Sequence, residues 1–322
     1  MTFYRLCDFL IESNVILSGL LAAGKADTRQ TFRLRPVRPS FLVIDNWLRH
    51  QKLPDGTEWL SVARLKGEYL LRFTNLADFT VSADGWQINC YPHGNIVNET
   101  ASHLLLDQVI PAVLAHQGEL VLHASGVVSD YGAIAFLGES GSGKSTLCAG
   151  FNRAGFPQLS DDFLLLRASK DGFVAVPSYP GLRLWPDSRT ALKWEAADTT
   201  PVAHYTTKER LDTSSHGLPF CSVPVPITTL FVLTSPDETM KTDQVSIEPL
   251  THQDAFMALL KYSFRLDISD RERNKKAFRD IAETVSKLKL FRLSYPRKMA
   301  MLPQVRTAIL EHLATEERAM EK

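Results

Sequence analysis

A glycine-rich segment at residues 138–146, GESGSGKST, limits the folds open to this chain more than any other stretch. It fits the phosphate-binding pattern G-x-x-x-x-G-K-[ST] and follows the apolar run AIAFL at 133–137. This context predicts a strand that enters a tight turn, and then a helix whose first N–H groups are available to phosphate oxygens. The predicted nucleotide-binding residues are Gly138, Glu139, Ser140, Gly141, Ser142, Gly143, Lys144, Ser145 and Thr146.

The residue types in this segment suit that chemistry. Its three glycines let the backbone turn tightly and approach an anion without a Cβ in the way. Lys144 supplies a point charge for the terminal phosphates of ATP, and Ser145 is placed to ligate Mg²⁺. The simpler interpretation is a glycine-rich turn before an ordinary helix. The strand before it and the helix-compatible run 144–153 favour phosphate binding.

Composition narrows the function classes. The chain has 322 residues, 44% of them hydrophobic, which suffices for two domains with packed cores. Its 36 basic residues balance 36 acidic ones, so no overall charge attracts nucleic acid or an anionic membrane. The four scattered cysteines form no C-x-x-C pair and predict neither a disulfide framework nor a zinc site. The apolar stretch 15–23 is too short to span a bilayer, and we expect a cytoplasmic protein.

Short apolar runs broken by turn signals predict a mainly β domain at residues 1–95. The runs lie at 41–44, 59–62, 69–73, 79–81 and 86–88, with hairpin turns at 54–56 and 83–85. Residues 91–95 are the predicted linker, and a helix is predicted from Asn98 to about His116. The second domain is then 96–322, and the mixture of helices and strands indicates an α+β fold.

Two further segments suggest chemistry beside the glycine-rich loop. Residues 120–128 form a strand pattern that carries His123, and Asp161 and Asp162 precede the apolar run 163–166. Paired carboxylates near bound phosphates can hold Mg²⁺ and accept the proton of an attacking hydroxyl, although the pair could also be a plain turn. Lys208 and Arg210 are candidate phosphate-side cations within the polar, irregular stretch 198–224, where a solvated loop is an equal alternative.

The later part of the chain alternates helix and strand patterns. Residues 177–186, PSYPGLRLWP, are too rich in proline for a central strand, and a helix is expected from Asp187. Strands are predicted at 227–233, 244–247 and 290–293, and helices around 256–260, 278–288 and 302–313.

His123, the glycine-rich loop and the paired aspartates together resemble the catalytic core of the HPr kinase/phosphorylase family. The segments 179–186, 291–297 and 302–303 are similar to HPr-kinase-like proteins of bacterial biosynthetic clusters. The resemblance covers roughly residues 100–315. It implies a P-loop kinase domain related to phosphoenolpyruvate carboxykinases, which uses ATP and Mg²⁺ to phosphorylate a serine hydroxyl.

The resemblance also implies roles for single residues. Asp161 corresponds to the general base, Asp162 to a metal-binding carboxylate, and His123 to a histidine near the transferred phosphate. Lys144 completes the predicted catalytic set. The family's Glu-Ile-Arg-Gly-Leu-Gly signature is replaced here by YPGLR at 179–183, without the glutamate, so a reverse phosphorylase activity and HPr as substrate are not expected to follow.

Three functions are compatible with the sequence. The leading one is a serine kinase acting on a protein or peptide; the others are a kinase of a small hydroxylated metabolite and a nucleotide-binding regulator without turnover. HPr kinases assemble as oligomers, which leaves a homo-oligomer open here. Residues 1–92 match nothing in that family.

Overall fold

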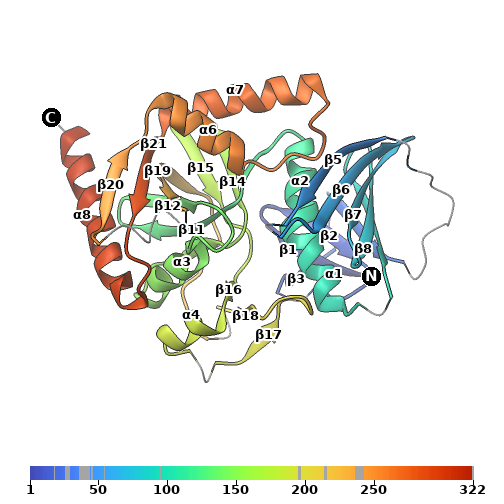
Figure 1. The fold of residues 1–322 in the computed structure, drawn as a ribbon, viewed down its shortest axis with the longest axis horizontal. Helices are drawn as coiled ribbons and strands as arrows, with labels where there is room; N and C mark the ends of the chain where they lie inside the picture. The colour runs from blue at the N-terminus through green and yellow to red at the C-terminus, as the bar shows by residue number, and fades with distance from the viewer. Residues whose placement is uncertain are drawn as a thin grey trace. The chain divides into compact units, whose positions relative to one another are not determined.

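The computed structural model describes residues 1–17, 19–25, 30–35, 44, 46–53, 55–94, 96–194, 197–213, 216–235 and 243–320, and these form two compact units (Figure 1). The first comprises Met1–Glu119, Val202–Thr206 and Phe264–Ala277; the second comprises Leu120–Pro201, Thr207–Ser263 and Phe278–Lys322. The first unit thus extends past residue 95 to include a helical segment and two stretches distant in sequence. Both units combine helices with strands, so the chain is an α+β protein.

A nine-stranded sheet in the order β3-β1-β2-β4-β9-β8-β7-β6-β5 dominates the first unit. Its strands are β1 (Thr2–Leu6), β2 (Phe9–Ser13), β3 (Leu21–Ala23), β4 (Gln30–Leu34), β5 (Trp47–Lys52), β6 (Glu58–Leu65), β7 (Glu68–Phe73), β8 (Ala77–Ser82) and β9 (Gln87–Pro92). The predicted strands at 59–62, 69–73, 79–81 and 86–88 are confirmed as β6 to β9. The predicted run 41–44 lies mostly outside the described residues, as do Pro54 of the first hairpin turn and Asn95 of the linker.

The predicted helix from Asn98 to His116 is also confirmed, with one irregular turn. It consists of α1 (Asn98–Leu104), the π-helical turn η1 (Leu105–Val109) and α2 (Ile110–His116). Its C-terminal end packs at the β8–β9 turn, where His116 Nε2 lies 2.9 Å from the carbonyl oxygen of Ala83. This hydrogen bond ties the helix to the sheet of the same unit.

The second unit is built on a mixed nine-stranded sheet. Seven of its strands follow the order β10-β14-β15-β19-β12-β11-β13, in which β12 runs parallel to β19. Strand β21 also pairs with β19, and β20 pairs with β21. The strands are β10 (Leu120–Leu122), β11 (Ala124–Ser129), β12 (Gly132–Leu137), β13 (Gln158–Ser160), β14 (Leu164–Ser169), β15 (Gly172–Val176), β19 (Val225–Leu233), β20 (Ser246–Pro249) and β21 (Lys289–Ser294).

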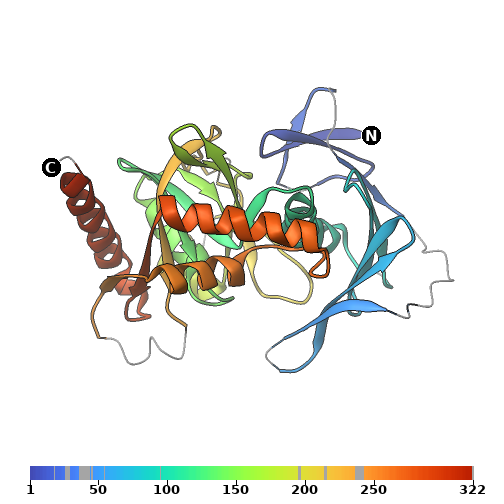
Figure 2. The same cartoon turned by 90° about the horizontal axis from the view of Figure 1, so that it is seen from above.

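Helices cover both faces of this sheet because consecutive residues of a central strand, β12, are apolar, which makes both faces apolar. On β12, Ala135 faces a core shared with α6 (His252–Tyr262) and α7 (Arg271–Lys287), whereas Phe136 faces one shared with α3 (Lys144–Arg153) and α8 (Leu302–Met320). Figures 1 and 2 both show α6 and α7 side by side. The sheet that carries the glycine-rich loop is therefore held between two helical layers.

A small three-stranded sheet completes the second unit. It has the order β16-β18-β17, with β16 (Leu182–Leu184), β17 (Thr199–Pro201) and β18 (Glu209–Leu211), and the helix α4 (Pro186–Ala191) follows β16. We expected the stretch 198–224 to be irregular. This expectation is wrong in part, because β17 and β18 form within it. Its pairing partner, β16, lies in the proline-rich segment.

The expectation of one strand over 120–128 is wrong. The chain forms two strands that are separated by His123. Strand β10 pairs with β14, whereas β11 pairs with β12 and β13. A single straight strand cannot pair with both sets of neighbours, so the chain bends at this residue.

None of the helices in the described part of the chain combines the length and apolar composition that crossing a membrane requires. All four cysteines lie in described ranges, and none forms a disulfide.

Candidate functional site

The glycine-rich loop joins the end of β12 to the start of α3. Gly141 and Gly143 have φ angles of +77° and +96°, a region that favours glycine. A Cβ on Gly143 would lie 2.9 Å from the hydroxyl oxygen of Tyr295, and one on Gly138 would lie 2.5 Å from Ser142 Oγ. Glycine is therefore favoured by conformation at Gly138, Gly141 and Gly143, and by space at Gly138 and Gly143.

Lys144 is the first residue of α3, and its side chain turns back into the loop. Its Nζ donates hydrogen bonds to the carbonyl oxygens of Gly138 at 2.8 Å and Glu139 at 2.9 Å. Burial lowers the Lys144 pKa to about 8, while the negative charges of Asp162 and Asp161 act against this shift. The two carboxylates are thus within electrostatic reach of the lysine.

Neighbouring elements hold the loop from outside. Glu139, exposed in the loop, forms a 2.7 Å ion pair with Lys261 of α6. Arg297 donates from Nη1 to the carbonyl oxygen of Gly141 at 2.7 Å. Ser140 is exposed, Ser142 is buried and Ser145 is half-buried in the first turn of α3.

Thr146 is tied to α4. Its Oγ1 lies 3.1 Å from Ser188 Oγ. This contact connects the first turn of α3 to the helix that follows the proline-rich segment.

His123 occupies the bend between β10 and β11, and two backbone contacts fix it. Its N–H donates to the carbonyl oxygen of Tyr262 at 2.7 Å, and its ring Nδ1 lies 2.8 Å from the carbonyl oxygen of Asp162. Because a carbonyl only accepts, Nδ1 carries the proton and Nε2 is the acceptor nitrogen. Burial, and then the charge of Lys144, lower the His123 pKa to about 4, so the ring is neutral at pH 7.

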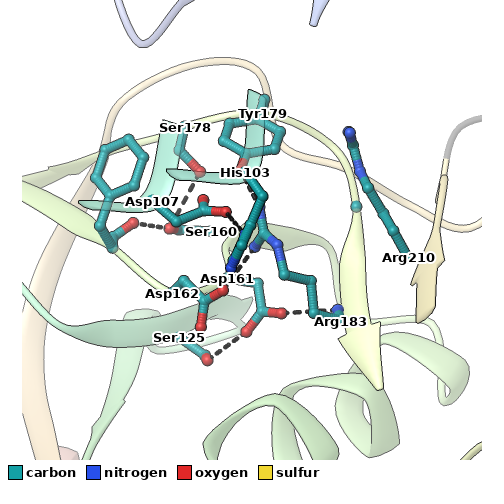
Figure 3. Close-up of polar contacts among 12 residues, drawn as sticks. His103, Asp107, Ser125, Ser160, Asp161, Asp162, Ser178, Tyr179, Arg183 and Arg210 are labelled. Carbon is teal, nitrogen blue, oxygen red and sulfur yellow. Dashed lines mark hydrogen bonds and ion pairs between the residues drawn. The ribbon is translucent and has the colours of Figure 1, made fainter. Parts of the chain in front are cut away.

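Asp161 follows β13 and is buried; Figure 3 shows its contacts with Ser125 and Arg183. Its Oδ1 accepts from Ser125 Oγ at 2.7 Å, and its Oδ2 accepts from the backbone N–H of Arg183 at 2.9 Å. Burial raises the pKa of this carboxyl, and the negative charge of Asp162 raises it further. Asp161 is held in one orientation in an environment that makes its carboxylate more basic than usual.

Asp162 adopts a left-handed backbone conformation with φ of +71°, which is uncommon outside glycine. Its carbonyl oxygen is held by His123, and its Oδ2 forms a 2.9 Å ion pair with Nη1 of Arg183. Contacts at both ends stabilise the turn, and the two consecutive carboxyl groups contact different groups of Arg183.

Arg183 and Tyr179 belong to this cluster, and our reading of the sequence assigned neither a role. Arg183 lies in β16 and is 4% exposed, and its Nη2 donates to the Tyr179 hydroxyl. The segment 177–186 did stand out by its proline content and its resemblance. That Arg183 contacts both aspartates depends on β16 lying beside the end of β13, which no local pattern shows.

The two expected cations both lie near the cluster, in different surroundings. Lys208 Nζ lies 5.2 Å from the ring centroid of Trp185, and its charge contributes to the lowered pKa values of Lys144 and His123. Arg210 is opposite Arg183 in the β16–β18 pairing, and its guanidinium carbon lies 5.3 Å from the Tyr179 ring centroid.

The oxygen donors of this site suit a magnesium ion that is bound jointly by the protein and a phosphate ligand. They suit a metal held by the protein alone less well. Among the described residues, no three His, Cys, Asp or Glu side chains gather as a metal-binding group. Mg²⁺ bound with nucleotide phosphates needs only one or two protein ligands, because phosphate oxygens and water supply the rest. Asp162 and Ser145 are oxygen donors of the required type.

No protein-family model matches the sequence, and no curated protein matches it. Among solved structures, the Hpr(Ser) kinase/phosphatase from Coxiella burnetii is similar to this chain at 12% identity and a TM-score of 0.33. The match covers 61% of this chain and 98% of that one. We therefore interpret the site from its own geometry.

Proposed function

We propose that this chain is a kinase that uses ATP and Mg²⁺ to phosphorylate a serine hydroxyl of a protein or peptide. The observation that carries the proposal is the convergence of two segments, the glycine-rich loop with Lys144 and the turn with Asp161 and Asp162. The negative charges of Asp162 and Asp161 both act to raise the pKa of Lys144, which lies at the end of the glycine-rich loop. A phosphate-binding cation beside two carboxylates is the set that phosphoryl transfer to a hydroxyl requires.

Nucleotide binding is assigned to the loop and the first turn of α3. The positive-φ glycines let the backbone approach an anion closely, and the N-terminus of a ten-residue helix favours negative charge. Lys144 is the charge partner of the terminal phosphates. Its lowered pKa of about 8 rises on meeting a phosphate, because an adjacent negative charge favours the ammonium form.

Asp162 and Ser145 would hold Mg²⁺. When bound, the ion neutralises charge on the phosphates and helps to align them. Lys208 and Arg210 are the candidate cations on the phosphate side, and Lys208 is the better placed because its charge already reaches Lys144.

Asp161 is the proposed general base. The serine oxygen bonds to the terminal phosphorus, the bond from that phosphorus to the bridging oxygen of ATP breaks, and the serine proton passes to the Asp161 carboxylate. The products are a phosphoserine and ADP. Hydrogen bonds from Ser125 and the Arg183 backbone hold the base, so its orientation needs no rearrangement.

His123 is assigned a positioning role. Because its ring is neutral and its Nδ1–H is committed to the Asp162 carbonyl, it supports the turn that carries both carboxylates. A neutral ring also avoids placing a further full positive charge beside Lys144. Because Nε2 carries no proton, it cannot donate a hydrogen bond to the oxygens of the transferred phosphate, which supports a positioning role over direct contact.

The test is transfer of label from terminally labelled ATP, in the presence of Mg²⁺, to the protein fraction of a lysate of the source organism. We expect label on serine with the wild-type protein and none with Lys144→Ala or Asp161→Asn. Only Lys144→Ala should strongly weaken ATP binding. Asp130→Asn is the matched control, because Asp130 is exposed in the turn between β11 and β12.

Wild-type turnover in Asp161→Asn would contradict the assignment of the base. Label confined to small molecules would favour a metabolite kinase. ATP binding without any transfer would favour a regulator.

A further inference from the structure

A single residue, Arg183, holds both consecutive aspartates, and it does so with different groups. Its backbone N–H donates to Asp161 Oδ2 at 2.9 Å, whereas its guanidinium Nη1 pairs with Asp162 Oδ2 at 2.9 Å. The main-chain contact depends on the path of β16, and the ion pair depends on the side chain. The two contacts can therefore change independently.

The ion pair occupies the carboxylate that the proposed function assigns to Mg²⁺. The Arg183 side chain is 4% exposed and that of Asp162 is 14% exposed, so water screens the pair little. A divalent cation on the same carboxylate would approach the guanidinium closely, and like charges repel strongly where screening is weak. Metal binding and this ion pair thus oppose one another.

Tyr179 keeps the guanidinium near the site without neutralising it. Its hydroxyl accepts from Arg183 Nη2, and the Arg183 guanidinium carbon lies 5.4 Å from the ring centroid. The aromatic ring and the hydroxyl stabilise a cation but leave its charge in place. Figure 3 shows the guanidinium between Tyr179 and Asp162.

We infer that the Arg183 guanidinium and a divalent cation compete for the Asp162 carboxylate, so that Arg183 is a positioning residue that sets the metal affinity of the site. This inference rests on the proposed function for its choice of metal. Displacing the guanidinium leaves the backbone bond to Asp161 intact, so the base stays oriented while Asp162 changes partner.

The experiment measures Mn²⁺ binding, by the electron paramagnetic resonance signal of free Mn²⁺, in this chain with and without a non-hydrolysable ATP analogue, because phosphate oxygens supply ligands that the protein lacks. We expect Arg183→Gln to bind Mn²⁺ about tenfold more tightly than wild type, because the competing charge is gone while the backbone N–H remains. Arg183→Lys should fall between the two, since it keeps the charge but loses the planar donor group. Asp162→Asn should lose the site.

Arg189→Gln is the matched control, because it removes an arginine from another ion pair of the same unit, with Glu209. Its Mn²⁺ affinity should equal that of wild type. If Arg183→Gln does not fold, as judged by circular dichroism, the Arg183→Lys value decides. Unchanged or weaker Mn²⁺ binding in the folded Arg183 variants overturns the inference, as does wild-type binding in Asp162→Asn.

The two proposals fail separately. Tighter Mn²⁺ binding in Arg183→Gln, with no phosphate transfer by wild type, would support the competition and reject the kinase. Transfer by wild type without the change in affinity would reject the competition alone.

Discussion

Asp161 and Asp162 are adjacent in sequence, yet their surroundings give them different chemistry. Asp161 is fully enclosed and accepts hydrogen bonds from a hydroxyl and a backbone N–H. Asp162 faces a guanidinium and turns its carbonyl to His123. A carboxyl with a raised pKa suits a base, and an ion-paired carboxylate suits a cation ligand. Arg183 produces this division, because it meets Asp161 with its backbone N–H and Asp162 with its guanidinium.

The pH dependence of transfer should report the Asp161 carboxyl. A base works only when ionised, so kcat/KM should fall as pH drops through the raised pKa of Asp161. The Ser125 hydroxyl stabilises the ionised form, and removing it should move this acid limb upward by about one pH unit. The measurement is the profile of kcat/KM between about pH 4 and 8 for wild type and Ser125→Ala. An acid limb at the same pH in both proteins would contradict the assignment.

At the scale of elements, the strand, loop and helix around residues 133–153 were predictable because all their signals are local. A continuous apolar run defines β12, glycines define the loop, and the helix begins at the lysine. The break at His123 was not predictable, since the residues on either side of it belong to one continuous strand pattern. Only the pairing of β10 with β14, far along the chain, separates them.

The two ends of α3 provide a matched test of the loop. Gly143 and Gly155 both have φ of +96°, but a Cβ on Gly143 would lie 2.9 Å from the Tyr295 hydroxyl and one on Gly155 would meet nothing within 4 Å. Gly155→Ala should lose about 1 kcal/mol of unfolding free energy from backbone strain alone. Gly143→Ala should lose about 2–3 kcal/mol.

Nucleotide affinity separates the two variants further. We expect Gly143→Ala to bind ATP at least tenfold more weakly, because its Cβ displaces the loop, and Gly155→Ala to bind as wild type does. Urea unfolding and ATP titration are the measurements. Equal losses of stability and affinity in both variants would show that strain, and not the space beside Tyr295, controls the loop.

At the scale of the whole molecule, the sequence indicated the α+β class and the change from strand runs to mixed elements near residue 95. It did not indicate that two later stretches, 202–206 and 264–277, belong to the first unit. These contacts join residues far apart in sequence. Thr100 Oγ1 lies 3.0 Å from His204 Nδ1, and Lys276 donates to the Gly118 carbonyl oxygen at 2.7 Å. Neither contact is associated with a periodic pattern in the sequence, so neither could be predicted from it.

The discontinuous first unit leads to a prediction about fragments. The side chain of Asp267 is fully buried, and its ion pair with Arg64 of β6 joins the stretch 264–277 to the sheet. A fragment of residues 1–119 lacks Asp267, His204 and Lys276. The loss of these partners leaves buried polar groups of the fragment unsatisfied. We expect the fragment to show no cooperative thermal transition by circular dichroism and to be degraded rapidly by protease, while the full chain resists.

In the full chain, Asp267→Ala should reproduce part of this loss, about 1–2 kcal/mol, because it removes the hydrogen bonds that the buried carboxylate accepts from Ser269 and its ion pair with the half-exposed Arg64 side chain. Lys275→Ala is the control, since its pair with Glu272 is exposed and such pairs contribute less than about 1 kcal/mol. A fragment that melts at the temperature of the full chain would show that residues 1–119 are sufficient to fold. The stretches 202–206 and 264–277 would then bind to a unit that is already folded. We expect instead that they are needed for folding, because Asp267 is buried in this unit.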